Sequence, residues 1–177
     1  MLDQLGAESA ADDIDDLYGP LIGVWDVVNH YRAGDVDKHG TVVWTFGRIL
    51  AGRGVQDVMW FTAPGDDGYP VRMTGSTVRL FDPAGAAWRV VWFSPGGTTG
   101  TLTGRPGEHG DIVQEGTNSA GKPARWLFTE VTGTTFRWLG YVSDDDGATW
   151  RREQEMLARR RPTPVTPGKT CPSPAAT

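Results

Sequence analysis

The chain has 177 residues, 38% of them hydrophobic, which is the size of one ordinary domain and enough to bury a core. Its formal net charge is −5, and its 17 basic and 22 acidic residues are spread along the chain. This balance argues against a nucleic-acid-binding protein, because phosphate recognition favours a concentrated basic surface.

The sequence also argues against membrane insertion, disulfides, metals and cofactors. It has no run of the ~20 apolar residues that a membrane span requires and no apolar leader, so we expect a cytoplasmic protein. Cys171 is the single cysteine, and the three histidines share no spacing typical of zinc ligands. Phosphate loops, dinucleotide-binding glycine motifs and nucleophile elbows are missing as well, so we expect no metal and no cofactor.

Three segments follow one another along the chain. Residues 1–19 are rich in aspartate and poor in large apolar side chains, which predicts an exposed acidic arm with a short helical turn near its end. Residues 20–161 carry the predicted domain. Residues 162–177 are polar and rich in proline, which predicts a disordered tail.

The predicted domain repeats one pattern, in which a run rich in Val, Trp, Phe, Thr and Arg is followed by a cluster of Gly, Pro, Asp or Asn. This pattern and the short connections are typical of antiparallel strands in all-β proteins. The predicted strands are residues 23–32, 40–50, 55–63, 74–82, 87–94, 97–104, 110–118, 123–131, 134–143 and 148–159. A sheet of about ten strands closes or splits, so we expect one up-and-down antiparallel β-barrel, with a β-sandwich as the alternative.

The first predicted strand opens with Gly23-Val24-Trp25, which resembles the Gly-x-Trp signature of lipocalins and related calycins. The resemblance implies a barrel whose tryptophan closes one end and is stacked by an arginine of the last strand, through a cation–π contact. Arg159 or Arg160 is expected to fill that place. Stretches such as WTFGRILAGRGVQDVMWF and DGATWRREQEM also resemble a group of actinobacterial lipocalin-like proteins, which implies the same fold and no particular reaction.

A second motif, Ser143-Asp144-Asp145-Asp146-Gly147-Ala148-Thr149-Trp150, matches the Asp-box of sialidase propellers. In those proteins the motif recurs from blade to blade, whereas here it occurs once in a chain too short for a propeller. We therefore interpret it as a hairpin turn whose aspartates bond backbone amides.

Strand residues alternate between faces, so a tryptophan that points inward carries its second neighbours with it. If the tryptophans point inward, the barrel interior is aromatic with a few polar groups, as in a small-molecule cavity. The expected ligand-binding residues are Trp44, Gln56, Trp60, Trp92, Gln114, Trp126, Trp138, Arg152 and Gln154. The expected partner is a small hydrophobic or aromatic molecule, and the oligomeric state is left open.

A shift of one residue would exchange the two faces. The dipeptides Gln56-Asp57, Gln114-Glu115 and Gln154-Glu155 place an amide and a carboxylate on opposite faces of three predicted strands. The tryptophan pattern favours inward glutamines at 56 and 154. In the other register, Asp57, Glu115 and Glu155 would enter the cavity and could serve as general acid or base.

Two functions suit such a barrel. The first is a cofactor-independent cyclase or isomerase, with Arg48 and Gln56 binding an oxygen and Glu130 moving a proton; Arg48 and Glu130 are its expected catalytic residues. The second is a carrier or sensor that binds a hydrophobic molecule without a reaction. A third possibility is a structural or protein-interaction barrel with no cavity, marked by a filled interior and an exposed apolar patch.

Overall fold

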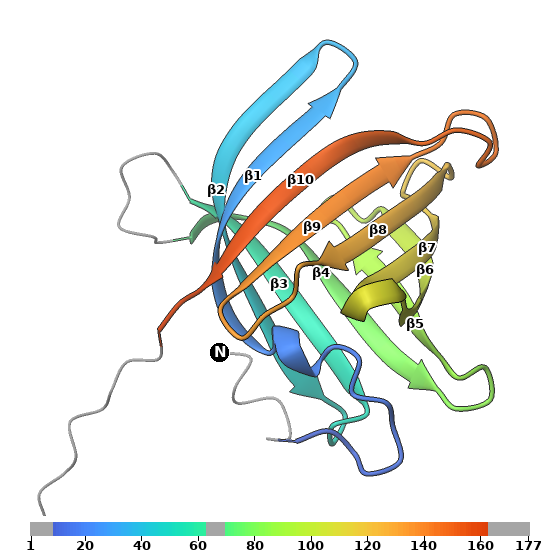
Figure 1. The fold of residues 1–177 in the computed structure, drawn as a ribbon. Coiled ribbons are helices and arrows are strands. Elements are labelled where there is room, and N and C mark those ends of the chain that lie inside the picture. The colour runs from blue at the N-terminus through green and yellow to red at the C-terminus, as the bar shows by residue number, and fades with distance from the viewer. Residues whose placement is uncertain (1–8, 63–69, 163–177) are drawn as a thin grey trace, which may run out of the picture.

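The structure is a computed structural model that describes residues 9–62 and 70–162. In these ranges ten antiparallel strands close into a barrel, each pairing with its neighbours in the chain, and β1 pairs with β10 (Figure 1). The strands are β1 (Gly23–Ala33), β2 (Val36–Ile49), β3 (Gly54–Thr62), β4 (Pro70–Asp82), β5 (Ala87–Phe93), β6 (Thr99–Pro106), β7 (Ile112–Thr117), β8 (Pro123–Thr129), β9 (Thr135–Val142) and β10 (Arg151–Arg160). The predicted all-β up-and-down barrel is confirmed, and the β-sandwich is excluded.

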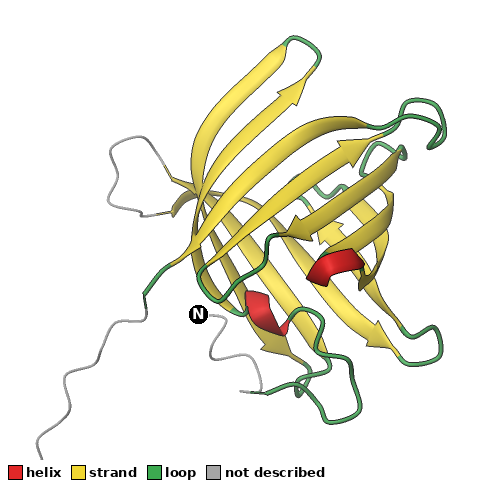
Figure 2. Ribbon diagram, viewed as in Figure 1, coloured by secondary structure: helices red, strands yellow, loops and turns green. Residues whose placement is uncertain are grey.

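Helix contributes little to the described part of the chain. Two single 3-10 turns, η2 (Gly19–Leu21) and η3 (Glu108–Gly110), accompany the strands (Figure 2). No helix in the described ranges has the length and apolar character needed to cross a membrane.

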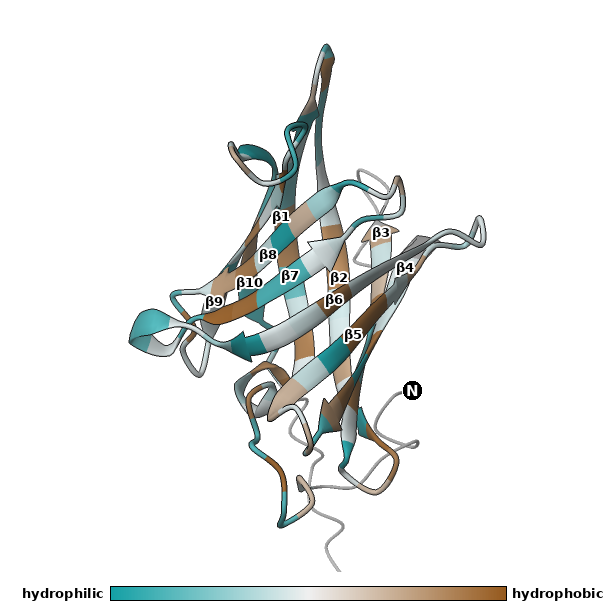
Figure 3. Cartoon of the chain, turned by 90° about the vertical axis from the view of Figure 1, so that its right-hand side faces the viewer, coloured by the Kyte–Doolittle hydropathy of each residue, from teal (hydrophilic) through white to brown (hydrophobic). Residues whose placement is uncertain are grey.

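Side chains alternate between the interior and the outer face of the barrel along its strands. In β1, Trp25, Val27 and Asn29 are buried in the interior, whereas Asp26 and Val28 are exposed on the outer face. Figure 3 shows apolar and polar positions following one another along neighbouring strands. The apolar face of each strand therefore faces the common core.

Trp25 and Arg160 close one end of the barrel. The Arg160 guanidinium carbon lies 4.1 Å from the centroid of the Trp25 indole, which confirms the contact implied by the Gly-x-Trp resemblance and assigns it to Arg160 rather than Arg159. The same guanidinium donates hydrogen bonds to the carbonyls of Pro20, Ile22 and Gly133. Glycine is required at position 23, because its φ is +130° and a Cβ would lie 2.5 Å from Arg160 Nη1.

The segment before β1 packs under this end instead of extending into solvent. Tyr18 is fully buried, its ring meets Trp88 edge-on with centroids 5.0 Å apart, and its hydroxyl accepts a hydrogen bond from Gln114. Asp16 accepts two hydrogen bonds of 2.7 Å from Arg48. The expectation of an exposed arm is therefore wrong for its last residues, because Tyr18 anchors them in the core. Residues 1–8 and 163–177 lie outside the described residues.

The hairpin of β1 and β2 is longer than predicted. Its register runs without a shift from Gly23 opposite Phe46 to Ala33 opposite Val36. β2 thus begins at residue 36 rather than 40, and the hairpin projects beyond its neighbours (Figure 1). Its outer part is a two-stranded extension of the barrel wall.

The Asp-box segment forms the predicted turn between β9 and β10. Asp145 accepts hydrogen bonds from the backbone amide and the hydroxyl of Thr149, at 2.7 and 2.6 Å. Ser143 Oγ accepts from the amides of Asp145 and Gly147. The interpretation of this motif as a hairpin turn is confirmed.

Candidate functional site

The barrel interior consists of a packed half and an open half. In the packed half Trp25, Trp44, Phe46, Phe128 and Phe136 contact one another, with ring centroids 4.6–6.2 Å apart. These separations are typical of close aromatic packing. The filled-barrel possibility therefore describes this half of the interior only.

The open half holds a cavity of about 330 Å³. Trp44 belongs both to the packed cluster and to the cavity wall, so its indole separates the two halves. The apolar part of the wall comes from Trp44, Met59, Phe61, Trp92, Trp126, Trp138, Val142 and Met156. The polar part comes from Tyr31, Thr77, Arg79, Asn118, Ser119, Tyr141, Glu153 and Gln154. Such a wall, apolar with several polar groups, is typical of small-molecule sites.

Gly140 of β9 leaves room for an indole in this wall. It lies opposite Trp126 of β8 and Gln154 of β10. A Cβ at position 140 would come within 2.7 Å of the Trp138 ring. The missing side chain therefore allows Trp138 to lie along the sheet and to shape the cavity.

A buried ion pair lies beside the cavity. Arg79 Nη1 and Asp57 Oδ2 are 2.6 Å apart, and both side chains are 1% exposed. The other Asp57 oxygen accepts a hydrogen bond from the Thr77 amide at 3.1 Å. The Arg79 guanidinium also lies over the rings of Tyr18 and Phe46, at 5.0 and 5.5 Å. These contacts hold a cationic side chain in the cavity wall, with its charge compensated by Asp57.

Two buried N–H donors of the cavity wall have no acceptor among the described residues. They are the indole N–H of Trp44 and the Nε–H of Arg79. A buried donor without an acceptor carries a desolvation cost that a ligand oxygen could recover. Both donor atoms are themselves buried within residues of the cavity wall, so a ligand oxygen reaches them only after a small movement of neighbouring side chains.

Five of the residues expected to bind ligand lie in this wall: Trp44, Trp92, Trp126, Trp138 and Gln154. Gln154 is oriented by a hydrogen bond of 2.7 Å from its amide nitrogen to Asn29. Gln114 is fully buried but bonds to Tyr18. Arg48 is buried against Asp16 under the closed end, outside the cavity wall.

The predicted orientation of β3 is wrong. Trp60 pairs with Val43 on the outer face, and Gln56 bonds to Ser76 on the same face. Asp57 instead points inward, opposite Phe46. The physical reason is that this register buries Val55 and packs the partly buried Met59 and Phe61 against the core, and Arg79 compensates the carboxylate.

The predicted inward positions of Arg152 and Glu130 are also wrong. A register shift between Arg152 and Gln154 reverses the alternation within β10, so Gln154 faces inward while Arg152 pairs with Glu155 outside. β8 ends at Thr129, and Glu130 has a φ of +54° that breaks the alternation. Its side chain is 67% exposed and pairs with Arg137 at the outer surface.

The other two carboxylates of the alternative register are outside the barrel. Glu115 pairs with Arg125, and Glu155 pairs with Arg137, each at 2.6 Å. Only Asp57 of the three thus enters the interior. The sequence pattern did not single out Arg79. Its position opposite Val55 depends on how β3 pairs with β4, which the residues of one strand do not determine.

A wider hollow of about 680 Å³ lies on the outer face, across β2, β1, β10 and β9. The exposed side chains Val28 and Leu157 line it together with Glu130 and Arg159. The cavity inside the barrel suits a small molecule better, because four tryptophans and several polar side chains converge on it, whereas this groove has no tryptophan in its lining.

No protein-family model and no curated protein matches the chain. Solved structures do share its fold. The S-type phycobiliprotein lyase CPES from Guillardia theta matches with a TM-score of 0.56 and 10% identity, over 84% of this chain and 92% of that chain. Rv2717c from M. tuberculosis matches with a TM-score of 0.57 and 14% identity, over 85% of this chain and 100% of that chain. Together with the closed ten-strand barrel, these neighbours place the chain in the lipocalin-like fold.

Proposed function

We propose that this barrel binds a small, flat, aromatic or otherwise apolar molecule that carries a hydrogen-bond-accepting oxygen. The observation that supports this most is the aromatic cavity of about 330 Å³, two of whose wall residues, Trp44 and Arg79, each carry a buried N–H donor without an acceptor. A volume near the lower end of the usual range for ligand pockets suits one compact ring system.

The two donors define the polar end of the ligand. Arg79 Nη1 is held by Asp57, which leaves Nε as a donor on a side chain of the cavity wall. The indole N–H of Trp44 is a second donor in the same wall. A carbonyl or carboxylate oxygen would satisfy such donors, whereas a hydrocarbon would leave them unpaired.

Tryptophan fluorescence tests this proposal. Naphthalene and 2-acetylnaphthalene form a matched pair of probes that differ by one carbonyl group. We expect saturable quenching by both, with tighter binding of the ketone by about tenfold, the equivalent of one hydrogen bond. Trp44→Phe keeps the aromatic wall but removes the N–H, so it should reduce the preference for the ketone.

Trp60→Phe is the matched control, because Trp60 lies on the outer face. It should lower the total fluorescence and leave the affinity for both probes unchanged. If neither probe gave saturable quenching, the cavity would not be a ligand site. Equal affinities for the two probes would remove the acceptor oxygen from the proposal.

A cyclase or isomerase reaction is a second candidate, compatible with a lyase among the structural neighbours. Such a reaction needs a proton-transferring group at the ligand, and the exposed Glu130 does not reach the cavity wall. Glu153 does line the cavity, although it pairs with Arg151 at 2.6 Å. Once a ligand is identified, Glu153→Gln should abolish turnover and preserve binding under this hypothesis, whereas a carrier would show no turnover in either form.

A further inference from the structure

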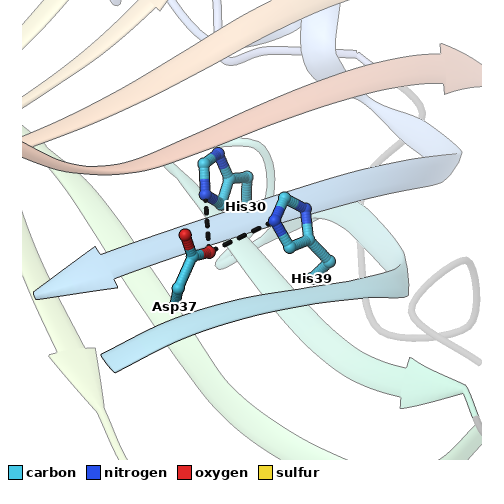
Figure 4. Close-up of side chains that lie close together, drawn as sticks. All are labelled: His30, Asp37 and His39. Carbon is cyan, nitrogen blue, oxygen red and sulfur yellow. Dashed lines mark hydrogen bonds and ion pairs between the residues drawn. The ribbon is translucent and has the colours of Figure 1, made fainter. Parts of the chain in front are cut away.

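Three potential metal ligands meet on the outer face of the long β1–β2 hairpin, away from the cavity wall. Figure 4 shows His30 of β1 and His39 of β2 directed toward Asp37 of β2. Asp37 Oδ1 lies 2.9 Å from His30 Nε2 and 3.2 Å from His39 Nε2. The ligand atoms of the three residues all lie within 4.8 Å of one another.

The strand pairing keeps these residues together. His30 is directly opposite His39, and the two rings are stacked with centroids 4.1 Å apart. Asp37 is two residues before His39 and therefore shares its face. Because the hairpin register is continuous, the backbone positions of the three residues are set before any ion binds.

We propose that His30, Asp37 and His39 bind a divalent transition-metal ion, with Zn²⁺ the preferred one. Two imidazoles and one carboxylate form a ligand set typical of zinc, and three protein ligands leave a fourth position for water or another molecule. Tetrahedral zinc with bonds of about 2.0–2.1 Å requires ligand atoms ~3.3 Å apart, close to the two separations seen here. An ion would replace the hydrogen bond from His30 and the ion-pair contact from His39 that now converge on Asp37 Oδ1.

Neighbouring charges are compatible with an ion at this place. Glu155 of β10 lies opposite His30, and Arg32 of β1 lies opposite Asp37. Glu155 is anionic and would attract a cation, although its ion pairs with Arg137 and Arg152 weaken that attraction, and Arg32 is the neighbour here whose charge opposes an ion. The three ligands are at least partly exposed, and their side chains can adjust without disturbing the core.

Isothermal titration of the metal-free, tag-free protein with ZnCl₂ tests the site. The protein should carry Cys171→Ser, because the thiol is itself a zinc ligand type. We expect one Zn²⁺ per chain, and Co²⁺ should give the visible absorption of a low-coordinate site. His39→Ala and Asp37→Asn should each weaken Zn²⁺ binding by more than about tenfold, since removal of a ligand costs at least as much as removal of a group that supports one.

His109→Ala is the matched control, since it removes the remaining histidine and leaves the hairpin unchanged. It should bind Zn²⁺ as the parent does. Circular dichroism should show an intact barrel in all variants, so a loss of binding cannot be attributed to unfolding. The proposal is overturned if the parent binds no Zn²⁺, or if His109→Ala weakens binding as much as His39→Ala does.

Discussion

Replacing Asp57 by Asn removes the carboxylate charge that compensates Arg79, while the size and shape of the side chain hardly change. The asparagine can still accept from the Thr77 amide, but its neutral amide does not compensate the guanidinium. Both side chains of the pair are 1% exposed. Breaking a buried ion pair on one side typically costs about 3–5 kcal/mol, because the remaining charge is left in a medium of low polarity. We expect Asp57→Asn to lower the free energy of unfolding by about 4 kcal/mol.

Glu115→Gln provides the control for burial. Its ion pair with Arg125 has the same N–O distance of 2.6 Å, but the side chains of Arg125 and Glu115 are 37% and 53% exposed. Solvent screening limits such a pair to under about 1 kcal/mol. The double variant Asp57→Leu/Arg79→Met should recover most of the stability lost in Asp57→Asn, because an apolar pair of similar size replaces the buried ion pair.

Urea unfolding followed by circular dichroism measures all four proteins. The transition of Asp57→Asn should shift strongly to lower urea concentration, and that of Glu115→Gln should hardly move. Equal losses in the two single variants would refute the reasoning, because burial would then not decide the cost. A double variant as unstable as Asp57→Asn would show that packing of the two residues, rather than charge, dominates.

Three further predictions concern the closed end and the Asp-box turn. Arg160→Lys keeps the charge but cannot reproduce the three carbonyl hydrogen bonds and the stacking on Trp25, so it should cost about 2 kcal/mol in urea unfolding; an unchanged midpoint would contradict this. Burial raises the pKa of Tyr18 from 10.0 to about 12, so the unfolded chain loses this proton first and the stability contribution, complete below pH 10, falls as the pH rises toward 12. Tyr18→Phe lacks this loss, and its stability relative to the parent should improve by about 1 kcal/mol between pH 9 and pH 11; a constant difference would disprove the assignment. Hydrogen bonds from Thr149 and Ser143 lower the pKa of Asp145 from 3.8 to about 2, so the stability they contribute is present above pH 4 and is lost as the pH falls toward 2. Acid titration of Asp145→Ala should therefore show a shallower loss of stability in that window than the parent, and parallel curves would rule out this role.

The sequence predicted the strands and favoured the barrel over a β-sandwich, and the strand pairing of the structure decided for the barrel. Alternating apolar residues and clusters of turn residues are local signals, and they located all ten strands of the described structure to within a few residues. Gly23, Trp25 and Arg160 could be connected through a known motif. The aromatic wall of the cavity followed from the same alternation, as Trp44, Trp126 and Trp138 show.

Local pattern failed where two faces of a strand carry comparable signals. In β3, Trp60 indicated one orientation, but burial of Val55, packing of Met59 and Phe61 against the core, and the ion pair of Asp57 favoured the other. In β10, the register shift after Arg152 changed the orientation within one strand. Neither effect is a property of a single strand, because each depends on the total surface buried against its neighbours.

Composition and periodicity thus predicted an all-β chain with an aromatic interior, and the Gly-x-Trp resemblance implied that its barrel is lipocalin-like. The tertiary structure alone decided which polar groups share that interior, since Arg79 meets Asp57 only through the register of β3 and β4. It also decided that His30 and His39, without ligand-like spacing in the sequence, lie face to face. The physical reason is the same in both cases: pairing between strands brings together side chains whose distance along the chain carries no information about their distance in space.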